Sequence, residues 1–240
     1  MLREISNWKN LILANGVAIE DFQLDQLNLY HSLLREWNSK VNLISRKDEP
    51  NIWPNHILHS ISPLFQLSIP NGVMAADIGS GGGLPGVPLA IMLPQVQMVM
   101  IESIKKKCDA LSDIVSRIGL HNTQVVHGRV EKLSVSKDHK KKFDVIFARA
   151  VAPLKDLIGW SVPLVRKQSG LMIETRAIPD LSSKPLLTPV LIAMKGGNLE
   201  GEIAQARELP HSTALHSFDV RFAGIEQTNL VGKKILIVSL

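Results

Sequence analysis

Apolar side chains recur at helical spacing in two segments near the start of the chain. Residues 20 to 38 carry the first stripe, and residues 57 to 65 carry the second, which ends before a turn at residues 70 to 72. The apolar members of the first stripe are Leu27, Tyr30, Leu33, Leu34 and Trp37. We therefore expect residues 1 to 70 to form a helical extension.

Beyond residue 70 the pattern changes to short apolar runs that alternate with helical segments. The runs typical of strands are residues 73–78, 97–101, 123–127, 143–149, 189–194 and 235–239. The helical segments between them are residues 86–93, 104–118, 153–165 and 199–208. This alternation predicts a second unit, residues 71 to 240, with an α/β fold and a doubly wound sheet of mostly parallel strands.

Two parts of this unit depart from the alternation. Residues 216 to 221 and 234 to 240 form a pair of apolar runs without a helix between them, so we expect a hairpin in which the last strand is antiparallel. Residues 166 to 188 are rich in proline and serine and contain one short apolar run at 171 to 174. We expect an insertion there.

The connection after the first strand is a glycine-rich turn. Residues 77 to 86 read Asp-Ile-Gly-Ser-Gly-Gly-Gly-Leu-Pro-Gly and lead into an apolar segment compatible with a helix. Glycines let the backbone adopt positive φ and let a ligand approach without meeting a Cβ atom, while a helix N-terminus presents free N–H groups. The turn therefore predicts a site for a cofactor with an adenosine end.

Two kinds of adenosine cofactor suit this turn. Gly81, Gly83 and Gly86 have the spacing of a dinucleotide site, and Glu102 follows at the distance where an acid would hold a ribose. Asp77 with Gly79, Gly81 and Gly83 also resembles the acid-first motif of class I S-adenosylmethionine-dependent methyltransferases. In that class an acid ends the second strand, which is the place of Glu102.

Three observations favour the methyl donor over NAD. The carboxylate of Asp77 is expected close to the cationic methionyl group, whose charge it would offset. The terminal hairpin is similar to the reversed last strand of class I methyltransferases, and Pro85 suits the first turn of a helix. We expect a Rossmann-like class I fold that binds S-adenosylmethionine, with an NAD-binding oxidoreductase as the less favoured alternative.

Composition excludes several other classes. The single cysteine, Cys108, cannot form a disulfide framework, and no cysteine-rich metal site is expected. No apolar run without charges approaches the roughly 20 residues that span a bilayer, and the N-terminus shows no secretory pattern. We expect a cytoplasmic protein that binds no membrane and no metal. No apolar surface stands out as an interface, and a monomer is expected.

The formal net charge of +5 is concentrated in one part of the chain. Residues 101 to 150 carry 11 basic and 6 acidic side chains, an excess that would attract a polyanion such as RNA. A solvated surface would produce the same pattern, so the charge alone leaves both interpretations open. The candidates for RNA contacts are Lys105, Lys106, Arg129, Lys140, Lys141 and Lys195.

The absence of two motifs limits which atom can accept the methyl group. Cys108 lies inside a predicted helix, away from the strand ends, which argues against a cysteine nucleophile for pyrimidine methylation. The Asn/Asp-Pro-Pro-aromatic turn of adenine amine methyltransferases is replaced by Ala148-Arg149-Ala150. A lone pair such as guanine N7 carries no proton and needs no general base, so it is compatible with this sequence.

Several segments resemble one family. The chain is similar to the ribosomal RNA small subunit methyltransferase G family, also called the glucose-inhibited division protein B family. The matching segments are 37–45, 56–60, 77–86, 128–131, 143–150 and 194–196. The resemblance implies methylation at N7 of one guanine, position 527 of 16S ribosomal RNA, with S-adenosylmethionine as donor and the RNA or the small ribosomal subunit as partner. A non-catalytic ribosome-assembly factor that binds RNA through the basic face is the alternative.

The resemblance also implies roles for single residues. The donor contacts would be Gly79, Leu84, Val130, Glu131 and Arg149, with Glu102 at the ribose. Catalytic residues remain unassigned, and the candidates are Arg149, Lys195 and His56. Arg149 and Lys195 follow successive strands of the predicted sheet, so they are expected at the same edge. Surface charge is the alternative for both, and packing for His56. One departure is His59, where the family usually has aspartate.

Overall fold

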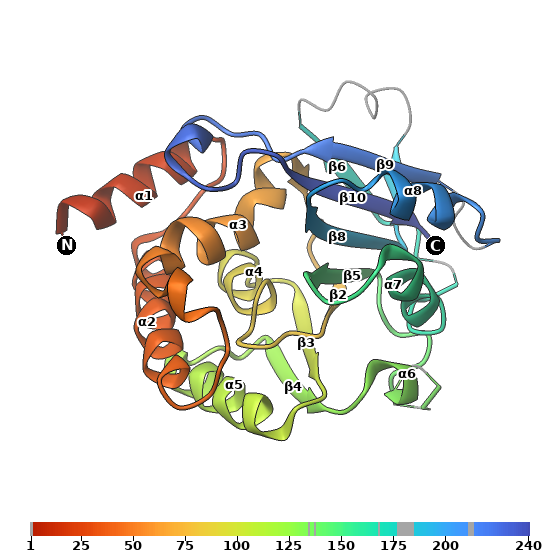
Figure 1. Cartoon of the computed structure of the whole chain (residues 1–240), viewed down its shortest axis with the longest axis horizontal. Coiled ribbons are helices and arrows are strands. Elements are labelled where there is room, and N and C mark those ends of the chain that lie inside the picture. Colours follow the sequence, from red (N-terminus) through yellow and green to blue (C-terminus); the bar gives the residue numbers. More distant parts are fainter. Residues whose placement is uncertain (1, 134, 137, 168, 177–184, 211–213) are drawn as a thin grey trace.

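A seven-stranded sheet forms the centre of the computed structural model (Figure 1), which describes residues 2–133, 135–136, 138–167, 169–176, 185–210 and 214–240. Its strand order is β4-β3-β2-β5-β8-β10-β9. The strands are β2 (Met74–Ile78), β3 (Gln97–Glu102), β4 (Thr123–His127), β5 (Val145–Arg149), β8 (Val190–Gly196), β9 (Ala214–Asp219) and β10 (Lys233–Ser239). The first five are parallel, and β10 is antiparallel to both of its neighbours. The predicted doubly wound sheet with a reversed last strand is confirmed.

Helices cover both faces of this sheet because the strands are apolar on both sides. Alternate residues of β5 belong to different cores: Val145 and Phe147 pack on one face, and Ile146 and Ala148 on the other. The first face is covered by α2 (Asp21–Asn38), α3 (Leu58–Ile61), α4 (Gly86–Met92) and α5 (Lys105–Ile118). The second face is covered by α6 (Val130–Leu133), α7 (Leu154–Ser161) and α8 (Glu200–Arg207).

The first 65 residues are largely helical, but not as two simple helices. An additional helix, α1 (Leu2–Ala14), precedes the predicted one, and the expected helix at residues 57 to 65 is divided into three turns of different pitch. Pro63 lacks the N–H that would continue an α-helix beyond Ile61, which accounts for the change to η3. The short elements are η1 (Arg46–Asn51), the π-helix η2 (Trp53–Ile57), and the 3-10 helices η3 (Ser62–Phe65) and η5 (Ile225–Gln227).

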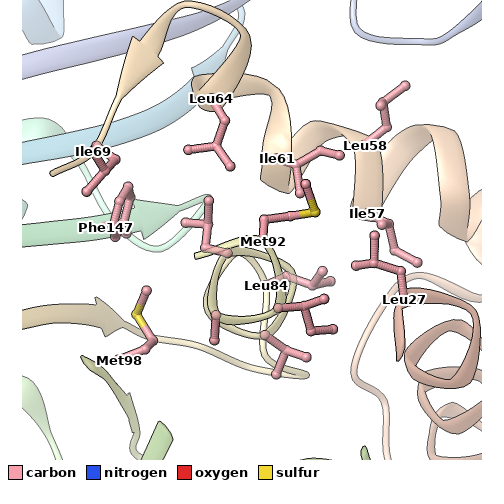
Figure 2. Packing of buried hydrophobic residues seen from close by; sticks show 14 of the residues in the cluster. Leu27, Ile57, Leu58, Ile61, Leu64, Ile69, Leu84, Met92, Met98 and Phe147 are labelled. Carbon is pink, nitrogen blue, oxygen red and sulfur yellow. The ribbon is translucent and has the colours of Figure 1, made fainter. Parts of the chain in front are cut away.

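The N-terminal helices share one core with the sheet. Figure 2 shows Leu27 and Ile61 on one side of α4 and Phe147 of β5 on the other, with Met92 between them. The hydroxyl of Tyr30, fully buried in α2, donates a hydrogen bond to the carbonyl oxygen of Gly82 at 2.9 Å. Helix α2 therefore supports the glycine-rich turn directly.

The predicted insertion at residues 166 to 188 contributes to a small second sheet. Its strands are β1 (Leu67–Ser68), β6 (Met172–Thr175) and β7 (Leu186–Leu187), in the order β1-β6-β7 and all antiparallel. The short strand expected at 171 to 174 is thus present one residue later, while residues 168 and 177 to 184 lie outside the described residues. The pairing of β1 with β6 joins the N-terminal segment to the second unit.

The described helices include none that is long and apolar enough to cross a membrane.

Candidate functional site

The glycine-rich turn lies at the carboxyl end of β2, where the strand order reverses between β2 and β5. The backbone N–H groups of Gly79 and Ser80 both donate to the carbonyl oxygen of Ile101 in β3, at 2.9 and 3.1 Å. Ligands of open α/β sheets bind outside the carboxyl ends of the strands at such a reversal. The turn is therefore held in the position where a cofactor is expected.

Two carboxylates hold the backbone of this turn through hydrogen bonds. The side chain of Glu102, which is 5% exposed, accepts the N–H of Gly81 at 2.9 Å through Oε2 and the N–H of Ile104 at 2.8 Å through Oε1. Asp77 is fully buried, and its Oδ2 accepts the N–H of Gly86 at 3.0 Å while Oδ1 has no partner. Burial raises the pKa of Asp77 to about 7.

A cavity of about 130 Å³ opens beside the turn. Its lining residues are Gly79, Ile101, Ser103, Gly128, Arg129, Val130, Glu131, Val151 and Trp160. Three predicted donor contacts, Gly79, Val130 and Glu131, thus come together here. Leu84 does not line this cavity, since its side chain is 5% exposed and packs in the apolar core (Figure 2). Arg149 also lies outside this cavity.

This arrangement fits the donor end of S-adenosylmethionine. An ideal Cβ at Gly81 would meet no heavy atom within 4 Å, so the turn leaves open space above its backbone. The buried Oδ1 of Asp77 lacks a hydrogen-bond partner, and a cationic ligand beside the turn would favour the ionised form of this carboxyl group. Glycines, an acid below the turn and apolar Val130 match an adenosine with a positively charged tail.

A larger cavity of about 460 Å³ lies over the carboxyl ends of β5 and β8. It brings together all three catalytic candidates, His56, Arg149 and Lys195, although they are far apart in the chain. The other lining residues are Asp48, Asn55, His59, Ala150, Met194, Gly196, Leu199, Glu202, Asn229, Leu230 and Lys233. The parallel pairing of β5 with β8 accounts for Arg149 and Lys195, whose strands end at one edge.

Two histidines hold the guanidinium of Arg149. Its Nη2 donates to Nδ1 of His56 at 3.1 Å, and its Nη1 lies 3.5 Å from Nδ1 of His59. Burial lowers the pKa of His56 to about 4 and that of His59 well below its usual range, and the charge of Arg149 lowers both further. Both imidazoles are therefore neutral at physiological pH and can accept hydrogen bonds through Nδ1.

Lys195 has a different environment in the same cavity. Its ammonium lies 2.5 Å from Oε2 of Glu202 and 2.8 Å from the carbonyl oxygen of Ala152. The same Oε2 accepts the N–H of Leu154 at 2.9 Å, which fixes the start of α7. Lys195 is thus held in one orientation by its ion pair with Glu202 and is not a free surface charge, which was the alternative interpretation.

The two cavities share one wall. Arg149 and Ala150 line the larger cavity, and Val151, the next residue, lines the smaller one. Ala150 has φ of +55°, a conformation that costs a residue with a Cβ about 1 kcal/mol or more and that recurs at functional sites. Arg149, which ends β5, and the two residues after it thus lie between the smaller and the larger cavity.

The predicted RNA contacts fall at opposite edges of the sheet. Lys105, Lys106 and Arg129 follow β3 and β4, at the edge that carries both cavities, and Lys105 pairs with Asp109. Lys140 and Lys141 precede β5, and the N–H of Lys141 donates to Pro163 beyond the end of α7. In a parallel sheet, the residues that precede the strands lie at one edge and the residues that follow the strands lie at the opposite edge. The predicted RNA-binding lysines and arginine therefore do not form one patch.

Sequence reasoning missed several lining residues. No sequence pattern indicated Asn55, Glu202 or Lys233, because tertiary packing brings the elements that carry them to the cavity. Cys108, which the sequence places inside a helix, is 4% exposed and lies in α5, and its thiol lies 3.2 Å from the carbonyl oxygen of Glu102. Within the described residues no group of three or more His, Cys, Asp or Glu side chains is arranged to hold a metal ion.

The packing of the turn predicts unequal effects of two glycine substitutions. Gly83→Ala is expected to destabilise the protein by roughly 3 kcal/mol, because φ is +96° and the new Cβ would lie 2.5 Å from Val87 and 2.8 Å from Leu111. Gly81→Ala, with φ of +55° and no atom within 4 Å, is expected to cost about 1 kcal/mol. Urea unfolding of both variants measures the difference, and equal losses would contradict this packing.

Comparisons with known proteins agree with the geometry. A family model described as rRNA small subunit methyltransferase G matches residues 23–179. A protein named ribosomal RNA small subunit methyltransferase G from Chlorobium luteolum is 35% identical over 218 residues, which cover 88% of this chain and 81% of that protein. A protein of the same name from Bacteroides fragilis is 34% identical, with 96% and 99% covered.

Solved structures show the same fold at low sequence identity. A predicted O-methyltransferase of Agrobacterium tumefaciens superposes with a TM-score of 0.53 and 13% identity, covering 76% of this chain and 79% of that one. A fibrillarin pre-rRNA processing protein of Methanococcus jannaschii gives a TM-score of 0.50 and 12% identity, with 74% and 72% covered. At this identity the likeness concerns the fold alone.

Proposed function

Because this chain belongs to the rRNA small subunit methyltransferase G family, we propose that it transfers a methyl group from S-adenosylmethionine to N7 of guanine 527 in 16S ribosomal RNA. The observation that carries the proposal is the pair of cavities on either side of residues 149 to 151. One cavity adjoins the glycine-rich turn, and the other has a volume in the range of pockets that hold small ligands, about 300 to 1,000 Å³.

The residues of the smaller cavity would bind and orient the donor. S-adenosylmethionine supplies an electrophilic methyl group on a cationic sulfur. Glu102, below the turn, keeps the turn in place through the N–H of Gly81 and would also accept a ribose hydroxyl group. Val130 and the backbone of Gly79 would pack against the adenosine, and the carboxyl group of Asp77 would favour the positive charge from below the turn.

The residues of the larger cavity would hold the acceptor base. Guanine N7 has an in-plane lone pair and no proton to lose, so the reaction needs alignment of the two groups rather than a general base. Arg149, held by His56 at the wall between the two cavities, and Lys195, held by Glu202 at the end of the neighbouring strand β8, would donate hydrogen bonds to the base. We propose that this wall brings N7 into line with the methyl group.

Calorimetry with purified protein tests the choice of cofactor. We expect S-adenosylmethionine to bind at one site and NAD to show no binding, because the acid-first turn and the family both favour the methyl donor. Binding of NAD without binding of S-adenosylmethionine would overturn the proposal. A ribosome-assembly factor without catalysis would bind small subunits yet leave their RNA unmethylated in the presence of the donor.

A further inference from the structure

Three consecutive lysines, Lys140, Lys141 and Lys142, lie at the edge of the sheet that is opposite to both cavities. They precede β5, and the carboxylate of Asp144 accepts the N–H of Met74, at the start of β2, at 2.8 Å. This edge is therefore the one at which the parallel strands begin, whereas the cavities adjoin residues at which those strands end. Neither cavity accounts for these cations.

The segment that carries the three lysines is bound to the segment after α7. The N–H of Lys141 donates to the carbonyl oxygen of Pro163 at 3.0 Å. The N–H of Lys142 donates to the carbonyl oxygen of Leu164 at 2.8 Å, and Nε of Arg166 donates to that of Lys142, also at 2.8 Å. The two segments together form the amino-edge patch, whose basic members are Lys140, Lys141, Lys142, Arg166 and Lys167.

The amino-edge patch keeps most of its positive charge. Its five basic residues are all exposed. Arg166 lies 3.6 Å from Oδ1 of Asp144, while none of the four lysines forms an ion pair among the described residues. Asp138 is the other carboxylate described in these two segments. Five basic side chains against two carboxylates leave an excess of three positive charges.

This accumulation of charge is unfavourable for the isolated protein. Like charges repel one another in the folded chain, and a polyanion that binds them relieves the repulsion. Lys141 also has φ of +56°, a conformation that costs a residue with a Cβ about 1 kcal/mol or more and that recurs at functional sites. The turn thus presents unpaired lysines at an energetic cost, which a bound polyanion would offset.

The amino-edge patch is too far from the larger cavity to hold the same nucleotide. The strand β5 has five residues and rises about 3.3 Å per residue, so it separates the two places by roughly 16 Å. The Debye length at physiological ionic strength is about 8 Å, so the field of the patch is largely screened at the cavity. A substrate that contacts both places must extend well beyond one nucleotide.

We propose that the amino-edge patch binds the sugar-phosphate backbone of a second segment of ribosomal RNA, while the guanine to be methylated lies at the opposite edge of the sheet. The inference rests on the proposed function, which supplies ribosomal RNA as the substrate. Lysine ammonium groups act as point charges toward phosphate oxygens and read no base sequence. The protein thus contacts its substrate at two places, which a folded RNA offers and an isolated nucleotide does not.

Replacement of three lysines of the patch by glutamine tests the proposal. We expect the triple variant Lys140→Gln/Lys141→Gln/Lys142→Gln to bind small ribosomal subunits at least about tenfold more weakly than the natural chain, as measured by the fluorescence anisotropy of labelled protein. The slope of log K against log salt concentration should become less steep by about 2, because each phosphate contact contributes about 0.7 to 0.9. An unchanged affinity and an unchanged slope would overturn the proposal.

A matched variant removes three cations that each pair with a carboxylate on the N-terminal helices or on α5. It carries Lys9→Gln, Arg35→Gln and Arg117→Gln, so the net charge changes by the same amount. We expect it to bind small subunits with the affinity of the natural chain. Equal losses in the two triple variants would show that net charge governs binding, which contradicts a role of the amino-edge patch.

Methylation kinetics separate RNA binding from damage to the cavities. The patch variant should raise KM for small subunits about tenfold and leave kcat unchanged, because its substitutions lie at the edge opposite to both cavities. Its affinity for S-adenosylmethionine, measured by calorimetry, should equal that of the natural chain. A lower kcat with an unchanged KM would contradict the proposal.

Deproteinised 16S ribosomal RNA distinguishes RNA from a ribosomal protein as the partner of the patch. We expect the patch variant to lose affinity for this RNA as well as for subunits. A loss for subunits alone would point to an acidic protein surface and overturn the proposal. Failure of the proposed function would look different: the natural chain would transfer no methyl group to RNA, whatever the binding of the patch variant.

Discussion

A protein with Glu102→Ala is expected to bind S-adenosylmethionine about a hundredfold more weakly than the natural chain. The carboxylate of Glu102 is the acceptor for the N–H groups of Gly81 and Ile104, at 2.9 and 2.8 Å. A hydrogen bond to a charged group contributes about 1.5 to 3 kcal/mol, so the loss of both frees the turn and leaves two N–H groups without this acceptor. Isothermal titration calorimetry with the donor measures the change.

Two further substitutions make this measurement specific. Glu102→Gln keeps the size of the side chain and one acceptor oxygen, and an intermediate loss of affinity is expected. Glu208→Gln alters an exposed glutamate after α8 and should have no effect. Urea unfolding establishes that each variant is folded at the temperature of the titration. Donor binding by a folded Glu102→Ala protein at the natural affinity would contradict the assigned place of the turn.

The second large effect concerns Asp77 and the pH dependence of stability. Its pKa is raised from the usual 3.8 to about 7 in the folded protein, first of all by burial. Below about pH 4 both the folded and the unfolded states hold the proton. Between pH 4 and 7 the unfolded state loses it and the folded state keeps it, so the free energy of unfolding falls with rising pH, by roughly 4 kcal/mol from this group.

Asp77→Asn is expected to remove this contribution. The amide oxygen can still accept the N–H of Gly86, and the side chain no longer ionises. Urea unfolding of both proteins at a series of pH values between 4.5 and 8 gives the difference, in which all other titrating groups cancel. The stability of the variant relative to the natural chain should increase with pH up to about 7 and then level off. A difference independent of pH would show that Asp77 ionises normally.

Much of the fold follows from the sequence because the sheet is buried on both faces. The strands Met74–Ile78 and Val145–Arg149 are mostly apolar runs bounded by turns, with Asp77 and Arg149 near their ends, and such runs are recognisable without tertiary information. The two-residue strand Leu67–Ser68 has no period to detect, so the small second sheet was not predicted. The division of residues 53 to 65 was also missed, although Pro63 was a visible signal against a continuous helix.

The sequence predicts the proximity of site residues only where that proximity follows from the order of the strands. Arg149 and Lys195 end neighbouring parallel strands, so their proximity follows from the strand order. Asn55 and His59 lie 94 and 90 positions before Arg149 and contact it because the N-terminal helices pack over the end of β5. No local sequence pattern indicates that contact. The positions of Lys140 and Lys141, at the other edge of the sheet, show why a count of charges along the chain does not define a surface.

The most direct test of the central claim is methylation of small ribosomal subunits that lack the modification. Subunits from cells without the enzyme are incubated with the purified protein and tritiated S-adenosylmethionine, and 7-methylguanosine is located by borohydride reduction and aniline cleavage of the RNA. We predict incorporation of one methyl group and cleavage at guanine 527 of 16S ribosomal RNA. Incorporation without cleavage at that position, or transfer only to protein, would contradict the account.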